Sequence, residues 1–125
     1  MTTEVKQSDV ERLMSRSLLD VFNERDSGAR SEAIAEVYSH SVRFFEQDEV
    51  VNGRTALARK VQALLDGTPP DWVFTPVGEV SVNHDLGRLR WALGPPGGAQ
   101  AVTGTDVALV SGDQISSLYV FVDPR

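Results

Sequence analysis

The second half of the chain is a succession of strand-like segments with only short turns between them. Stretches rich in β-branched and aromatic residues occupy positions 72–83, 86–93, 100–110 and 115–122. The residues between them are turn formers: His84-Asp85, Pro95-Pro-Gly-Gly98 and Ser111-Gly-Asp113. Short turns of this kind join antiparallel neighbours, so the sequence predicts an antiparallel meander.

The first half carries helical spacing instead. Ser8 and Glu11 have the capping-box form and predict a helix that begins at Ser8, and apolar residues then recur at helical intervals from Val10 to Phe22. Two further helices are expected over residues 31–38 and 55–66. Helices followed by a run of strands indicate an α+β domain. A strongly curved sheet wrapped around three N-terminal helices would enclose a space.

Two shorter signals lie between the second and third helices. Residues 41–46 are typical of a strand, and Asn52-Gly53 is a turn dipeptide that follows two valines. Gly67 is placed to end the third helix.

Composition limits the classes of function. The chain has 125 residues, which suits one domain over 1–125, and it has no cysteine for disulfides or thiolate metal sites. Its net charge of −6 disfavours nucleic acid and anionic membrane as partners. No apolar stretch approaches the roughly 20 residues that span a bilayer, and the first residues resemble no export segment. A cytoplasmic protein is therefore expected, with no metal and no cofactor, because no motif for either occurs.

Asp106 is the residue that most needs an explanation. It lies in the middle of an otherwise uncharged strand segment and shares a face with Gly104 and Ala108. Burying an ionised acid without a partner is costly, so the group must be paired, protonated or functional. Arg90 is the natural structural partner, and a ligand oxygen is the functional one.

Glu46, His40 and Ser17 each have two interpretations. Glu46 follows an aromatic pair and would act as a proton-transfer base, or it belongs to a solvated acidic turn. His40 either shuttles protons or caps a helix end. Ser17 lies on the apolar face of the first helix, where it either bonds to its own main chain or donates to a ligand.

The remaining candidates are apolar or aromatic residues that are core by default but must in part line an enclosed space. The residues expected to contact a ligand are Ser17, Phe22, Tyr38, His40, Phe44, Trp72, Trp91 and Val120. The last strand is apolar on both faces, and helices cover only one of them. A second copy of the sheet would cover the other, which predicts a homodimer and a small apolar molecule as the partners of this chain.

The chain resembles the nuclear transport factor 2-like superfamily, also called the SnoaL-like or ketosteroid isomerase-like fold, over about residues 8–124. The resemblance rests on element order and on the segments EVYSHSVRFF (36–45), VNGRTAL (51–57), GTD (104–106), GDQI (112–115) and FVD (121–123). It implies a cone-shaped roll with a mixed, mostly antiparallel sheet.

Ketosteroid isomerase is the most useful template within that superfamily. The resemblance places Glu46 near the position of its aspartate base and Asp106 at the position of its protonated aspartate, an acid kept neutral by an apolar site. Ser17 stands where that enzyme has a tyrosine. Val120 stands where epoxide hydrolases and some cyclases of the superfamily have a catalytic aspartate.

Two functions remain open on these grounds. The first is an isomerase- or cyclase-like enzyme in which Glu46 moves a proton and Asp106 stabilises the oxyanion of an apolar carbonyl substrate. The second is a non-catalytic ligand-binding or dimerisation module with an apolar pocket.

Overall fold

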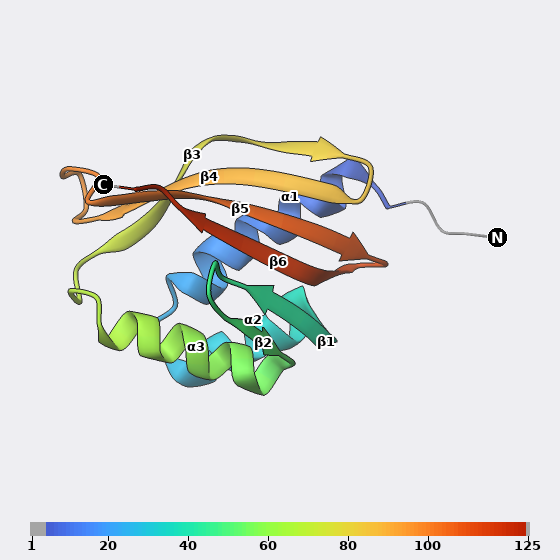
Figure 1. The fold of residues 1–125 in the computed structure, drawn as a ribbon, viewed down its shortest axis with the longest axis horizontal. Coiled ribbons are helices and arrows are strands. Elements are labelled where there is room, and N and C mark those ends of the chain that lie inside the picture. Colours follow the sequence, from blue (N-terminus) through green and yellow to red (C-terminus); the bar gives the residue numbers. More distant parts are fainter. Residues whose placement is uncertain (1–4, 125) are drawn as a thin grey trace.

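A computed structural model describes residues 5–124 of the chain, and Figure 1 shows its arrangement. The helices are α1 (Gln7–Arg16), the π-helix η1 (Ser17–Phe22), α2 (Ser27–Val37) and α3 (Arg54–Asp66). The strands are β1 (Tyr38–Phe45), β2 (Val50–Asn52), β3 (Val73–Asn83), β4 (Leu86–Gly94), β5 (Val102–Ser111) and β6 (Gln114–Val122). Residues 1–4 and 125 of the predicted domain lie outside the described residues.

The six strands form one sheet in the order β2-β1-β6-β5-β4-β3. All neighbours are antiparallel except β1 and β6, which are parallel, so the four long strands are the predicted meander and the sheet is mixed. Figure 1 shows α1 running behind the long strands, with α2 and α3 beside β1 and β2. The predicted α+β class with helices on a curved sheet is confirmed.

The start of the first helix differs from the prediction. The N-cap is Lys6, whose side chain makes no capping bond, and Ser8 lies inside α1, so the predicted capping box is wrong. The helical segment then continues from Ser17 as one stretch of π-helix. Such wide turns are rare and often occur at functional sites. Here it carries Leu18 and Phe22 toward the interior.

The second helix and first strand begin earlier than predicted. Asp26 accepts a hydrogen bond from the Ala29 amide at 2.8 Å, and this cap starts α2 at Ser27 rather than at residue 31. The strand β1 follows directly from Tyr38. The short strand β2 pairs with the end of β1, and the segment between them is closed by the Glu46 amide donating to the Glu49 carbonyl at 2.8 Å.

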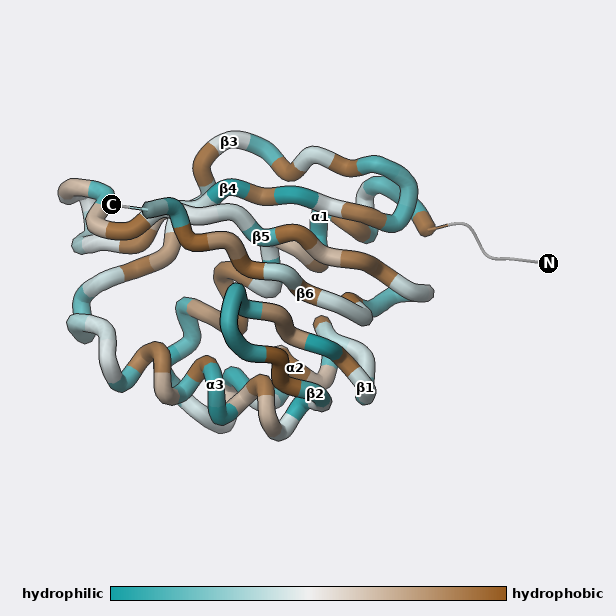
Figure 2. The backbone as a smooth tube through the Cα atoms, in the orientation of Figure 1, coloured by the Kyte–Doolittle hydropathy of each residue, from teal (hydrophilic) through white to brown (hydrophobic). Residues whose placement is uncertain are grey.

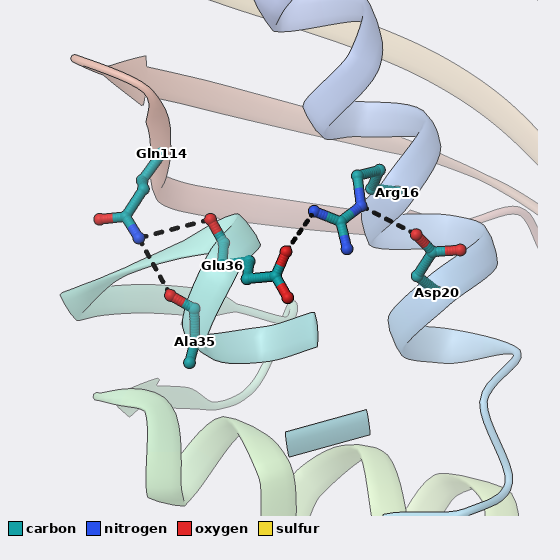
Figure 3. Close-up of polar contacts among 5 residues, drawn as sticks. All are labelled: Arg16, Asp20, Ala35, Glu36 and Gln114. Atoms are coloured by element: carbon teal, nitrogen blue, oxygen red, sulfur yellow. Dashed lines mark hydrogen bonds and ion pairs between the residues drawn. The ribbon is translucent and has the colours of Figure 1, made fainter. Parts of the chain in front are cut away.

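Polar contacts on the outside join the helical layer to itself and to the sheet (Figure 3). Arg16 donates from Nε to Asp20 at 2.9 Å and from Nη1 to Glu36 of α2 at 3.2 Å. Gln114, at the start of β6, donates to the carbonyls of Ala35 and Glu36 at 3.1 and 3.4 Å. These bonds fix the C-terminal end of α2 against both the first helix and the sheet.

The hydrophobic core lies between the helices and one face of the sheet. Figure 2 shows apolar and polar residues alternating along β3 and β4, as expected for strands with unlike faces. In β5 the inward residues Asp106, Ala108 and Val110 are buried, while Val107 and Leu109 between them are half-buried. Among residues 5–124, no helix combines the length and the apolar character that crossing a bilayer requires.

Candidate functional site

A pocket of about 330 Å³ penetrates between the helices and the sheet. Its rim includes exposed residues of α3 and of the connection that follows it, and its walls are mostly apolar. The lining residues are Leu18, Phe22, Phe44, Glu46, Leu64, Gly67, Thr68, Pro69, Trp72, Phe74, Trp91, Leu93, Val102, Asp106, Val120 and Val122.

Asp106 lies at the floor of this pocket, where it is only 4% exposed. The indole Nε1 of Trp91 donates to its Oδ1 at 2.9 Å. Of the two alternatives for this acid, pairing with Arg90 is not formed. Successive residues of β4 point to opposite faces, so that Trp91 points inward and the neighbouring Arg90 points outward. Arg90 instead pairs with Asp123 at 3.1 Å on the other face.

Gly104 explains why Trp91 can reach Asp106. The register places Trp91 directly opposite Gly104, two residues before Asp106 on β5. A Cβ at Gly104 would overlap the indole ring of Trp91 and the carbonyl oxygen of Phe121. The missing side chain therefore lets the indole lie against β5. Trp91 also makes an edge contact with Phe74, with ring centroids 5.3 Å apart.

The protonation state of Asp106 follows from its surroundings. Burial raises its pKa to about 7, and the hydrogen bond from Trp91 only partly opposes that rise. Among residues 5–124, the one hydrogen bond to this carboxyl is made to Oδ1. Every fully buried side-chain nitrogen or oxygen atom of these residues has a hydrogen-bond partner, so Oδ2, which has none, is not fully buried. The other oxygen, Oδ2, is therefore the one that remains accessible from the pocket.

Glu46 lies at the rim of the same pocket, at the end of β1. Its side chain is 35% exposed, and Lys60 of α3 contacts its Oε1 at 2.7 Å. Lys60 also contacts Glu49 at 2.8 Å, and the two carboxylates together raise the pKa of the ammonium group. Glu46 is thus neither a fully solvated acid nor a free base, because a cation from a neighbouring helix holds it.

Ser17 and Tyr38 form a buried pair outside the pocket lining. Their hydroxyl groups are hydrogen-bonded to each other. The interpretation in which the Ser17 hydroxyl bonds to the main chain of its own helix is therefore wrong. Burial raises the pKa of the Tyr38 hydroxyl, and the nearby charge of Asp106 adds to that rise. The pair joins η1 to the first residue of β1 within the core.

The structure divides the remaining predicted residues into two groups. Phe22, Phe44, Trp72, Trp91 and Val120 line the pocket, together with Asp106 and Glu46. Ser17, Tyr38 and His40 do not. His40 is exposed, and it lies in β1 where the register against β6 is irregular, between Tyr38 and Arg43.

Sequence reasoning missed several apolar wall residues. Leu93 and Val102 stand two positions from Trp91 and Gly104 on the inward faces of β4 and β5, and Val122 stands two positions from Val120 on β6. The period of two along each strand was the signal that would have found them.

The rim is held in place by two polar residues after η1. Asn23 makes a pair of hydrogen bonds to the main chain of Phe74, donating to its carbonyl at 2.8 Å and accepting from its amide at 2.7 Å. Arg25 donates to the carbonyls of Leu65 and Pro69 at 3.1 and 3.0 Å. These contacts tie the end of α3 and the start of β3 to the helical layer.

The arrangement offers acid–base chemistry and ligand binding. Among the described residues no group of three or more histidines or acids is placed to hold a metal ion. What the pocket presents is one buried carboxyl with an accessible oxygen, one rim carboxylate held by a lysine, and a wall of aromatic rings.

Comparison with known proteins identifies the fold. No protein-family model matches the chain, and no curated protein sequence is significantly similar to it. The architecture matches the fold of solved structures described as SnoaL-like and NTF2-like, which is the fold that the resemblance predicted.

Three solved structures illustrate the match. A proposed isomerase of the SnoaL-like family from Agrobacterium tumefaciens is 20% identical with a TM-score of 0.84, covering 94% of this chain and 100% of that one. A proposed SnoaL-like polyketide cyclase from Jannaschia is 14% identical with a TM-score of 0.78, covering 97% and 91%. A de novo designed protein with a curved β-sheet is 13% identical with a TM-score of 0.75, covering 96% and 89%. At such identities the likeness establishes the fold alone.

Proposed function

We propose that the protein binds a small, largely apolar molecule that carries a carbonyl group. In its neutral form Asp106 donates from Oδ2 to the carbonyl oxygen, and the aromatic walls cover the rest of the ligand. The observation that carries this proposal is a carboxyl at the floor of an apolar pocket whose hydrogen-bond partner is a neutral indole rather than a cation.

The same geometry supports isomerase- or cyclase-like proton transfer. Glu46 would take a proton from the carbon next to the carbonyl, and Asp106 would donate to the enolate oxygen that forms. Both carboxyls line one pocket, and Lys60 occupies Oε1 of Glu46 but leaves Oε2. The proposed isomerase and cyclase among the structural neighbours add support for this reaction class.

The alternative is a binding module without catalysis, and the Lys60 contact is the observation that favours it. A carboxylate held between a lysine and the end of a strand is less free to approach a substrate carbon. In that case the pocket would bind carbonyl ligands and leave their carbon–hydrogen bonds intact.

Hydrogen–deuterium exchange separates the two functions. A panel of β,γ-unsaturated and conjugated ketones is incubated in D₂O with the native protein, with Glu46→Gln and with Asp106→Asn. Enzyme-dependent exchange next to the carbonyl that falls in both variants supports catalysis. Binding of the ketones without exchange supports the module, and neither binding nor exchange would contradict the proposed function for this ligand class.

We further propose a homodimer through the uncovered face of the sheet. The rings of Phe45 and Tyr119 are stacked there with centroids 4.3 Å apart, and Phe121 is 51% exposed in the single chain. Burying such a patch against a second copy would remove apolar surface from water. Sedimentation equilibrium of the native protein and of Phe121→Ser tests this. A native dimer that dissociates in the variant supports the proposal, and a native monomer contradicts it.

A further inference from the structure

The pocket carries no positive charge of its own. Its lining residues include no lysine, arginine or histidine, and its two ionisable groups are both acids. Lys60 neutralises Glu46 from outside the lining. Asp106 receives only a neutral N–H, so when it is ionised its charge is uncompensated. An uncompensated charge of one sign in a low-dielectric pocket attracts a ligand of the other sign.

The walls are also suited to a cation. Five aromatic side chains line the pocket: Phe22, Phe44, Trp72, Phe74 and Trp91. The faces of such rings carry negative charge density and attract ammonium groups within about 6 Å of the ring centre. Phe74 joins two of the other rings, because it packs edgewise on both Trp91 and Phe22 at centroid distances of 5.3 and 5.9 Å.

We propose that the pocket also takes small apolar amines as ammonium ions, with the cation against Oδ2 of Asp106 and between the aromatic walls. Ligands of this class go beyond the carbonyl compounds of the proposed function, because they require the carboxylate rather than the neutral acid. The same oxygen donates a hydrogen bond to a carbonyl in one state and accepts one from an ammonium group in the other.

Binding of an amine is coupled to the loss of a proton from Asp106. The amine enters already protonated, the carboxylic acid of Asp106 releases one proton to solvent, and an ion pair forms. Near neutral pH both states of Asp106 are populated, because its pKa is about 7. The two ligand classes therefore respond to pH in opposite directions: amines bind more tightly above this value and carbonyl compounds below it.

The other charged and titratable groups on the surrounding elements are placed differently. Tyr38 is buried in the core beside Ser17, and Glu46 is held at the rim by Lys60. Away from the pocket lie Asp20 on η1, Glu79 on β3, Arg88 and Arg90 on β4, and Tyr119 on β6. Asp106 is thus the group in the pocket whose ionisation would govern amine binding.

A matched pair of probes tests the inference. Cyclohexylmethylamine and cyclohexyl methyl ketone share their apolar body and differ in the polar group. Each is titrated into the native protein between pH 5 and 8, with tryptophan fluorescence and calorimetry as readouts, because both tryptophans line the pocket. The amine should bind roughly a hundredfold more weakly at pH 5 than at pH 8, since the ionised fraction of Asp106 falls tenfold for each pH unit below its pKa of about 7. The ketone should show no such loss.

Two variants and the number of protons released on binding test whether Asp106 is the group that binds the amine. Asp106→Asn should abolish amine binding yet retain the ketone, because the amide still donates, while Asp123→Asn on the outer surface should change neither. Calorimetry at pH 6 in buffers of different ionisation enthalpy should record about one proton released per amine bound. Amine binding that survives in Asp106→Asn, that is lost only in Glu46→Gln, or that releases no proton would overturn the inference. Loss of ketone binding alone would count against the proposed function and leave this inference standing.

Discussion

The floor and the rim of the pocket each hold one carboxyl group, and the two groups are in opposite situations. Asp106 at the floor is buried and receives a hydrogen bond from the neutral indole of Trp91. Glu46 at the rim is 35% exposed and contacts the Lys60 ammonium group. The side chains have the same chemistry, so the difference arises from solvent and from the partner alone.

One apolar pocket can therefore hold a neutral carboxylic acid at its floor and a carboxylate paired with a lysine at its rim. A cation offsets the cost of ionisation at the rim, whereas at the floor that cost is left in place and a proton offsets it instead. Trp91 orients the floor carboxyl without neutralising it. The accessible Oδ2 is then a hydrogen-bond donor at low pH and an acceptor at high pH.

The free energy of unfolding should change most with pH, because of the raised pKa of Asp106 at the floor. The pKa of Asp106 is about 7 when folded and near 4 in an unfolded chain. The folded state holds this proton more tightly, so the ionisation penalty is absent below pH 4, grows between pH 4 and 7, and is constant above. It lowers the free energy of unfolding by roughly 4 kcal/mol at pH 8 relative to pH 4.

Urea denaturation of the native protein and Asp106→Asn across pH 4–8 measures this. The variant has no carboxyl group at this position, so its free energy of unfolding should not fall through ionisation there. Its stability relative to the native protein should therefore rise with pH. Asp123→Asn is the control, and it should not remove the loss. A native and a variant curve that run parallel across this range would contradict the assignment of a raised pKa to Asp106.

The next effect tests the contact that orients the floor carboxyl. Gly104→Ala places a Cβ against the Trp91 ring and the Phe121 carbonyl, and overpacking of this kind costs about 3 kcal/mol. Gly67→Ala at the rim is the matched control, because the nearest atom to a new Cβ there lies 3.7 Å away. Chemical denaturation should give a large loss for the first variant and less than about 0.5 kcal/mol for the second. Equal losses would mean that Trp91 does not lie against β5.

A smaller effect concerns the wall between floor and rim. Asn23→Ala removes both hydrogen bonds to the Phe74 main chain and should cost about 2 kcal/mol, since a part-buried amide and carbonyl lose their partner. Asn52→Ala, whose side chain accepts one exposed bond from Arg43 at 3.3 Å, should change the free energy of unfolding by less than about 0.5 kcal/mol. Thermal or urea unfolding checks both, and similar values for the two variants would refute the role of Asn23.

The smallest effect is expected at the rim ion pair. Lys60→Met should change the free energy of unfolding by only about 0.5 kcal/mol, because exposed ion pairs contribute little and are screened by salt. Denaturation at low and at 1 M salt tests this. A loss of several kcal/mol that salt leaves unchanged would show that the rim ion pair is shielded from solvent, as the floor carboxyl is.

The residues that sequence reasoning placed correctly are those governed by local periodicity. The alternation along β5 put Asp106 on the inward face, and the turn residues of the second half marked the hairpins of the meander. Local chemistry was not always sufficient, since the capping box at Ser8 was not formed and Asp26 rather than Ser31 marked the start of α2.

The pairings across the fold could not be predicted, because they depend on register and on helix placement. Charge complementarity favoured Arg90 as the partner of Asp106, but the pleat of β4 turns Arg90 outward and presents a neutral indole instead. The Lys60 contact with Glu46 depends on how α3 lies against β1. The bond between Ser17 and Tyr38 joins residues 21 positions apart.

Asp106, buried at the floor of the pocket, should be a neutral acid in the folded protein at mildly acidic pH. A carbon-13 NMR titration of its side-chain carboxyl, assigned by comparison with Asp106→Asn, measures this directly. The midpoint should lie near pH 7, because burial raises the pKa of this carboxyl. A midpoint near the ordinary aspartate value of about 4 would show that the floor carboxyl is already charged at mildly acidic pH, and that its burial does not keep it neutral.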